Sequence, residues 1–302
     1  MGAASAASPA LAVLALVFNA FVWGVSWWPF RSLHGHGLHP LWSTAFVYLL
    51  SLACLALLRP QAWRGFLQHP QLWLLAVAAG LTNVGFNWAV TIGDVVRVVL
   101  LFYLMPAWSV LLAWLLLGER PTPLRLLRLA LALAGVAVVL KTPEVAWPLP
   151  ASLPDWLALM GGFSFALTNI LLRRMSAAPV QSRVLAMFGG GALTATAVAL
   201  AGVVQGSVGA PVMLPPAAIA VMLALSLCFL VGNLALQYGA ARLAAHTTAL
   251  VMLSEVLFAS VSSVAAGAAE PALRTWIGGA LILAAAAWSA WPAGRPRAES
   301  AE

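Results

Sequence analysis

Long apolar stretches, separated by prolines or charged residues, make up most of the chain. They lack the alternation of apolar and polar positions that strands show, and each is about twenty residues long, the length of a helix that crosses a bilayer. Because lipid cannot satisfy open backbone groups, we predict an all-α membrane protein with ten transmembrane helices. The predicted spans are residues 10–29, 41–59, 71–91, 95–117, 124–141, 153–173, 182–205, 216–238, 244–266 and 273–292.

The composition supports this prediction. The chain has 302 residues, of which 63% are hydrophobic and 8% charged, whereas a soluble domain carries about 25% charged residues. The net charge of +7 comes from basic residues at the ends of apolar stretches, so we do not expect nucleic-acid binding. Cys54 and Cys228 lie inside such stretches, and we expect them to pack rather than form a disulfide framework.

The positions of Lys and Arg predict the orientation of the chain. With a cytoplasmic N-terminus, eleven basic residues fall in inside segments and only Arg31, Arg97, Lys141 and Arg274 fall outside. The first ten residues contain no Lys or Arg, so the first stretch reads as a retained span rather than a cleaved signal. We therefore expect both termini in the cytoplasm.

Similar segments recur in the two halves of the chain. A shift of 150 residues aligns "NVGFNWAV" (83–90) with "NLALQYGA" (233–240), so that Asn83 meets Asn233 and Asn87 meets Gln237. "FVWGVSWW" (21–28) also aligns with "FSFALTNI" (163–170), and "LGERPTP" (117–123) with "AGAAEPAL" (266–273). Five spans per half would give the halves opposite orientations, as in the inverted repeats of many transporters. We predict two repeats, residues 1–145 and 146–302.

These segments carry a resemblance to a known family. "FVWGVSWW", "LMPAWSVLLAWLLLGERPTP" (104–123), "YGAARLAAHTTALVMLSEVLFA" (238–259) and "EPALRTWIGGALIL" (270–283) resemble the drug/metabolite transporter superfamily with two EamA-type repeats. Within it, the chain looks most like the YddG-like exporters of aromatic and other amino acids. The resemblance implies export of amino acids or related small metabolites across a bacterial inner membrane. It also implies a central cavity lined by spans 1, 3, 4, 6, 8 and 9, with spans 5 and 10 at the periphery.

The chain departs from the family at one position. Many members carry proline in the ninth span where this chain has Val256, while Pro106 of the fourth span is kept. We therefore expect a hinge at Pro106, and an absent or differently made kink in the second half.

Amide side chains form one group of candidate site residues. Asn83 and Asn87 share a helix face, as do Asn233 and Gln237. They would either hydrogen bond between helices or form a polar wall that binds a zwitterion in a water-filled cavity. Asn169 extends this candidate set of substrate-binding residues.

Glu255 lies near the centre of the ninth span, where ionisable residues are costly and usually functional. It would bind a substrate ammonium, beside Ser254, or carry a coupled proton. The alternative is a structural partner for a nearby hydroxyl or amide. At the outer mouth, Asp94 and Arg97 are expected to pair at a helix start.

Aromatic residues near the middle of the spans would give the cavity flat apolar walls. The alternative is packing against lipid, since Trp is enriched at membrane interfaces. The candidates are Trp23, Trp27, Trp88, Tyr103, Trp108, Phe165 and Tyr238. The same walls would suit flat aromatic or cationic drugs, which is a second substrate hypothesis.

Three histidines, His34, His36 and His39, suggest a different class, a metal-handling membrane protein. No nearby carboxylate or thiol completes the set, so we predict no metal site. The sequence has no catalytic or nucleotide-binding motif, so we expect no enzyme activity, no cofactor and transport without ATP. The expected partners are a small-molecule substrate, the bilayer and a coupling proton, with no nucleic acid and no obligate protein partner.

Overall fold

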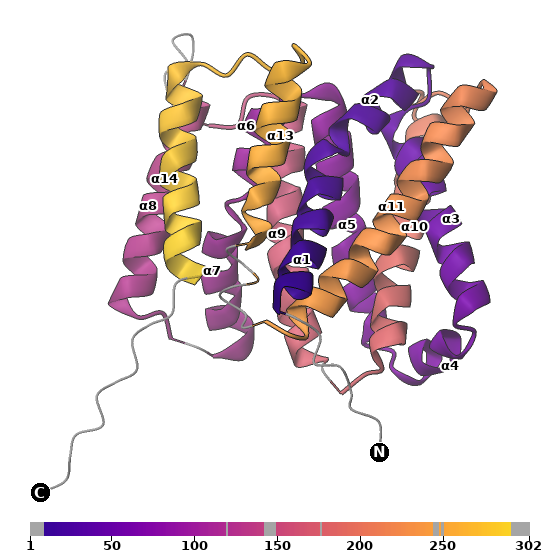
Figure 1. Ribbon diagram of the computed structural model, residues 1–302, viewed down its shortest axis with the longest axis horizontal. Coiled ribbons are helices and arrows are strands. Elements are labelled where there is room, and N and C mark those ends of the chain that lie inside the picture. The colour runs from indigo at the N-terminus through magenta and orange to yellow at the C-terminus, as the bar shows by residue number, and fades with distance from the viewer. Residues whose placement is uncertain are drawn as a thin grey trace, which may run out of the picture.

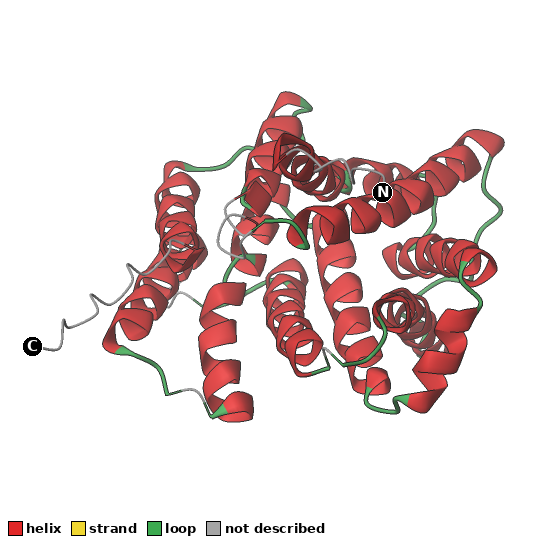
Figure 2. Cartoon of the chain, turned by 60° about the horizontal axis from the view of Figure 1, so that its bottom comes forward, coloured by secondary structure: helices red, strands yellow, loops and turns green. Residues whose placement is uncertain are grey.

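The computed structural model describes residues 9–118, 120–141, 149–175, 177–243, 248 and 251–290. Every regular element in these ranges is a helix (Figure 2), as the sequence predicted. The helices are α1 (Pro9–Val25), α2 (Trp27–Gly35), α3 (Pro40–Leu58), α4 (Gln61–Gln68), α5 (Leu72–Ile92), α6 (Val95–Phe102), α7 (Met105–Leu117), α8 (Pro123–Leu140), α9 (Leu153–Arg174), α10 (Val180–Val204), α11 (Pro216–Ala240), α13 (Ser254–Ala265) and α14 (Leu273–Ala290).

Eight segments of the described chain are long and apolar enough to cross a membrane, so the protein is a multi-pass membrane protein. Two of these segments each combine two helices, α1 with α2 and α6 with α7. α13 and α14 are shorter apolar helices. They occupy parts of the ninth and tenth predicted spans, of which residues 244–247, 249–250 and 291–292 lie outside the described residues.

Two local features differ from the predicted spans. The first span extends to Gly35 through α2, beyond the predicted end at residue 29. Residues 61–68 form the short helix α4 where we expected a loop. α4 buries Ala62 and Phe66, and the Ser182 hydroxyl donates to the Ala62 carbonyl, so this connection is held against α10.

α5 lies at the centre of the bundle and is the most buried of the eight segments. Small residues let its neighbours approach closely. A Cβ added at Gly190 of α10 would collide with the backbone of Ala76, and one added at Gly85 would lie 2.7 Å from the Leu157 carbonyl oxygen of α9. α5 therefore packs backbone to backbone on both sides.

The packing partners follow a regular scheme (Figure 1). α5 packs against α9 and α10, while α11 packs against α1 and α3. α8 packs against α14, α3 against α10, and α6 against α13. The start of α1 and the end of α14 lie at the same end of the bundle, at the bottom of Figure 1.

Candidate functional site

Two membrane helices are interrupted at matching positions. The span formed by α6 and α7 is broken by a turn at Tyr103 and Leu104. Residues 251–252 are helical, Leu253 is in a turn, and α13 begins at Ser254. The offset that aligned the amides, 150 residues, also carries Tyr103 onto Leu253 (103 + 150 = 253).

The first interruption lies just before Pro106, the predicted hinge. Pro106 occupies the first turn of α7, where a missing N–H costs no intrahelical hydrogen bond. The helix therefore breaks at residues 103–104 rather than bending at the proline itself. The second interruption forms without a proline, next to Val256.

The two interruptions contact each other through Tyr103. Its hydroxyl oxygen lies 3.0 Å from Glu255 Oε2 and 3.1 Å from the Met252 carbonyl oxygen. Tyr103 is 2% exposed and Glu255 7% exposed. A carboxyl group, a phenol and a backbone carbonyl thus meet inside the bundle. Among the described residues, no basic side chain forms an ion pair with Glu255.

Glycines bring the neighbouring helices close to this contact. A Cβ added at Gly24 of α1 would lie 2.7 Å from the Glu255 carbonyl oxygen. One added at Gly162 of α9 would lie 2.5 Å from the Phe102 carbonyl oxygen. The backbones of both interrupted helices are therefore in direct contact with α1 or α9.

A chain of aromatic rings begins beside Tyr103, whose ring centroid lies 6.3 Å from that of Phe102. Phe102 lies 4.8 Å from Phe86 and 5.6 Å from Phe165 between ring centroids, and Trp23 lies 5.9 Å from Phe86. Six of the predicted aromatic residues belong to or pack against the same apolar cluster: Trp23, Trp27, Trp88, Tyr103, Trp108 and Phe165. Phe86 and Phe102 belong to this cluster too, and the sequence analysis missed them because Phe is equally common on lipid-facing surfaces.

Three of the predicted aromatic residues contact polar or basic side chains. Trp27 donates its indole N–H to the Ser262 hydroxyl at 2.9 Å. Trp88 packs edge to face with His39, and Tyr238 lies under the guanidinium of Arg242 at 3.8 Å, near the end of α11. Tyr238 is therefore close to the C-terminal end of α11 rather than its middle.

The first pair of amides contacts α3. The Tyr48 hydroxyl donates to Asn83 Oδ1 at 2.5 Å, and the Asn87 amide donates to the Thr44 hydroxyl at 3.3 Å. Asn83 is 7% exposed and Asn87 fully buried, and Asn87 Oδ1 has no partner among the described residues. In this conformation, both amides bind between helices, and Asn87 keeps one unused acceptor.

The second pair of amides lies on α11. Gln237 donates to Asn233 Oδ1 at 2.7 Å, and both side chains are half-buried. Asn169 of α9 is exposed and donates to the Phe165 carbonyl, while Ser254 donates to the Val251 carbonyl. These polar residues are accessible, unlike Asn83 and Asn87.

The histidine segment serves as a helix junction. His34 ends α2, and the imidazole of His39 accepts the Leu41 N–H at the start of α3. Burial, and next the nearby His34, lower the pKa of His39, which favours the neutral ring that this hydrogen bond needs. In the described part of the chain, no three His, Cys, Asp or Glu side chains are placed to hold a metal ion.

An ion pair that was not predicted from the sequence joins the start of α6, the start of α9 and the end of α8. Arg97 binds both carboxylate oxygens of Asp155, at 2.7 and 3.1 Å, and donates to the Val139 carbonyl at 2.8 Å. Asp94 caps α6 by accepting the backbone N–H of Arg97 at 2.8 Å, so the two residues meet at the helix start as expected. The guanidinium of Arg97, however, forms its ion pair with Asp155 at the start of α9.

Arg31 of α2 likewise joins the ends of neighbouring helices. Its guanidinium donates to the carbonyls of Val90, Gly93 and Ala268, which lie at the ends of α5 and α13. A cation is favourable at helix C-termini because the last carbonyls are unpaired and carry partial negative charge. Arg31 of α2 and Arg97 of α6 together join six helices at the end opposite the start of α1: α2, α5, α6, α8, α9 and α13.

Comparisons with known proteins agree with this architecture. Residues 10–141 match the EamA-like transporter family. An uncharacterized transporter of Pseudomonas aeruginosa is 33% identical over 146 residues, which are 47% of this chain and 44% of that protein. Protein RarD of Streptomyces exfoliatus is 27% identical over 175 residues, 55% of this chain and 52% of that protein. The chain thus aligns with about half the length of these curated relatives.

A solved structure shares the fold. The crystal structure of a protein that is 19% identical superimposes with a TM-score of 0.59, covering 93% of this chain and 96% of its own. Residues 10–141, the larger part of the first predicted repeat, thus match the family that the sequence motifs resemble.

Proposed function

We propose that this protein is a secondary transporter that exports amino acids or related small metabolites across the bacterial inner membrane by alternating access. Both termini lie in the cytoplasm in this proposal. The contact of Tyr103 with Glu255 and Met252 carries the argument, because it joins two interrupted membrane helices through an ionisable group. Interrupted helices near the middle of the bilayer are where secondary transporters bind substrates and coupling ions.

The contact is sensitive to the protonation state of Glu255. The Tyr103 hydroxyl has a single proton but two acceptors within reach. When Glu255 is ionised, Tyr103 donates to the carboxylate. When Glu255 is protonated, it can donate to the Tyr103 oxygen, and Tyr103 then donates to the Met252 carbonyl. Proton binding at Glu255 would thus change the bond between the two interrupted helices, which supports Glu255 as a proton carrier.

The packing scheme supports two inverted repeats of five spans, residues 1–145 and 146–302. If span n corresponds to span n + 5, the pair α5–α9 corresponds to α11–α1, and the pair α5–α10 corresponds to α11–α3; all four pairs pack. The pairs α3–α10, α6–α13 and α8–α14 would each join a helix with its own counterpart. Such a structure has two nearly equivalent arrangements, which alternating access requires.

An amphipathic amino acid would use both the polar and the aromatic residues of the site. Glu255 and Ser254 would bind its ammonium group, the amides its polar head, and the aromatic rings its side chain. The proposed substrate-binding residues are Trp23, Trp27, Asn83, Asn87, Trp88, Tyr103, Trp108, Phe165, Asn169, Asn233, Gln237, Tyr238, Ser254 and Glu255. Of these, Asn83 and Asn87 would have to exchange their α3 partners for substrate.

Efflux of flat aromatic or cationic drugs is the second candidate. The aromatic cluster that includes Tyr103, the partner of Glu255, favours it, since a cation binds over aromatic faces. The amides of the proposed set favour the amino acid, because they add hydrogen bonds that a hydrophobic cation does not use. Efflux from loaded proteoliposomes, scanned over the twenty amino acids and a set of cationic dyes, separates the two. Movement of dyes alone would replace the amino-acid proposal.

A metal-handling protein is the alternative of another class. Replacing His34, His36 and His39 together with Ala tests it. An exporter of amino acids still exports in this triple variant, because none of the three side chains contacts Glu255; His34→Ala with His36→Ala, which keeps the contact of His39 with Trp88, should keep the full efflux rate. Loss of a response to Zn²⁺ or Cu²⁺, with amino-acid efflux absent in both proteins, would favour the metal hypothesis instead.

A further inference from the structure

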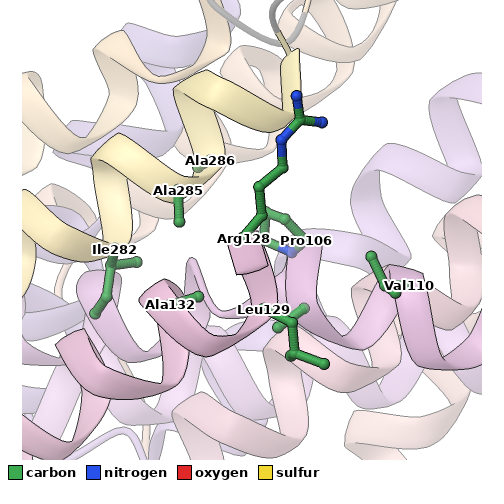
Figure 3. A pocket seen from close by; sticks show the side chains of 9 residues that line it. Pro106, Val110, Arg128, Leu129, Ala132, Ile282, Ala285 and Ala286 are labelled. Atoms are coloured by element: carbon green, nitrogen blue, oxygen red, sulfur yellow. The ribbon is translucent and has the colours of Figure 1, made fainter. Parts of the chain in front are cut away.

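A shallow hollow lies between α7, α8 and α14 (Figure 3). The hollow is open on one side and encloses too little space to hold a whole ligand, so an occupant would lie against its lining. Apolar side chains from all three helices line it: Pro106 and Val110, Leu129 and Ala132, and Ile282 and Ala285. Glu255 does not line it, so the hollow is separate from the proposed transport site.

The hollow lies beside a position where α8 and α14 pack tightly against each other. Next to that position, both helices carry alanine side chains that leave space unfilled. A Cβ added at Gly135 would lie 2.7 Å from the Gly278 carbonyl oxygen, so the backbones touch there. One turn towards the start of α8, Ala132 and Ala285 are too small to fill the space between these helices and α7. Open apolar space among membrane helices loses dispersion contacts unless a lipid chain fills it.

Arg128 is the charged residue of the lining, and none of the described lining residues is acidic. Its guanidinium lies over the Trp288 ring at 5.3 Å, and its buried Nε has no hydrogen-bond partner among the described residues. Figure 3 shows the side chain extending away from α8, beside α14, at the edge of the hollow. The ring holds the guanidinium in place, and its N–H donors remain open to an anion.

We infer that this hollow binds an anionic glycerophospholipid, with one acyl chain against the apolar lining and the headgroup phosphate on Arg128. A guanidinium binds phosphate through paired hydrogen bonds. Basic pockets between membrane helices on the cytoplasmic side are suited to anionic headgroups. Free inorganic phosphate would gain nothing from the apolar lining, which is why a lipid is the occupant.

Native mass spectrometry of the detergent-purified full chain tests this inference. The probes are phosphatidylglycerol, phosphatidylcholine and inorganic phosphate. The variants are Arg128→Gln, which removes the charge; Ala285→Leu, which fills the hollow but keeps Arg128; and Arg125→Gln, a control at an exposed arginine of the same helix. We expect the wild type to prefer phosphatidylglycerol about fivefold, the effect of one basic residue near an anionic lipid.

The inference requires that Arg128→Gln abolish this preference, that Arg125→Gln keep it, and that Ala285→Leu lower the retention of both lipids. Equal losses in the two arginine variants would overturn it, because binding would then follow overall charge. Displacement of phosphatidylglycerol by inorganic phosphate would overturn it in favour of a simple anion site. If Arg128→Gln does not fold, Ala285→Leu decides: unchanged lipid retention contradicts the inference.

Discussion

The hydrogen bond between Tyr103 and Glu255 leads to a prediction about stability. Tyr103→Phe removes the hydroxyl and leaves the Glu255 carboxyl, which is 7% exposed, without its described side-chain partner. A buried polar group that loses its partner costs about 1–3 kcal/mol, whereas replacing both partners by apolar groups is nearly neutral. Tyr103→Phe should therefore lower the free energy of unfolding by that amount, and Tyr103→Phe with Glu255→Met should recover most of it.

Unfolding of the purified protein in mixed micelles, titrated with a denaturing detergent, measures these differences. Tyr238→Phe is the matched control, since the Tyr238 contact with Arg242 uses the ring face and survives the change. A double variant that is less stable than Tyr103→Phe alone would refute the reasoning, as would a Tyr103→Phe variant as stable as the wild type. Either result would mean that the contact contributes nothing to the fold.

Two further changes test the packing and the closed end of the bundle. Gly190→Ala should cost about 1–3 kcal/mol, because its Cβ would lie 2.6 Å from the Ala76 carbonyl carbon. Gly35→Ala, whose Cβ would meet no atom within 4 Å, should be close to neutral in the same unfolding titration with a denaturing detergent. Arg97→Gln should cost about 3–5 kcal/mol, because it strands the buried Asp155; adding Asp155→Asn should recover part of this, and a double variant no better than the single would contradict the ion-pair account.

Helix positions followed from the sequence because they depend on local properties. The predicted span 71–91 compares with α5 at Leu72–Ile92, and 182–205 with α10 at Val180–Val204. Apolar length and proline boundaries determine such helices without knowledge of their neighbours. The family resemblance rested on the order of several weak motifs, and residues 10–141 match the EamA-like transporter family.

Side-chain partners could not be predicted in the same way. Arg97 and Asp155 are 58 residues apart, and Tyr48 and Asn83 are 35 apart, so each pairing depends on how the helices pack. The Ser152–Asp155 capping box was a readable signal for the start of α9, but the box gives no information about Arg97. The recurrence of amides in the two halves indicated where polar groups lie. It could not show that Asn83 hydrogen bonds to Tyr48 of α3, whereas the Gln237 side chain bonds only to Asn233 of its own helix among the described residues.

In the proposed function, Glu255 couples a proton to amino-acid export. Efflux of each amino acid from loaded proteoliposomes, with and without a pH gradient, tests it most directly when wild type and Glu255→Gln are compared. We expect a pH gradient to accelerate the efflux of at least one amphipathic amino acid in the wild type and to have no effect in Glu255→Gln. Gradient-driven efflux that persists in Glu255→Gln, or the absence of movement of every amino acid in the wild type, would contradict it.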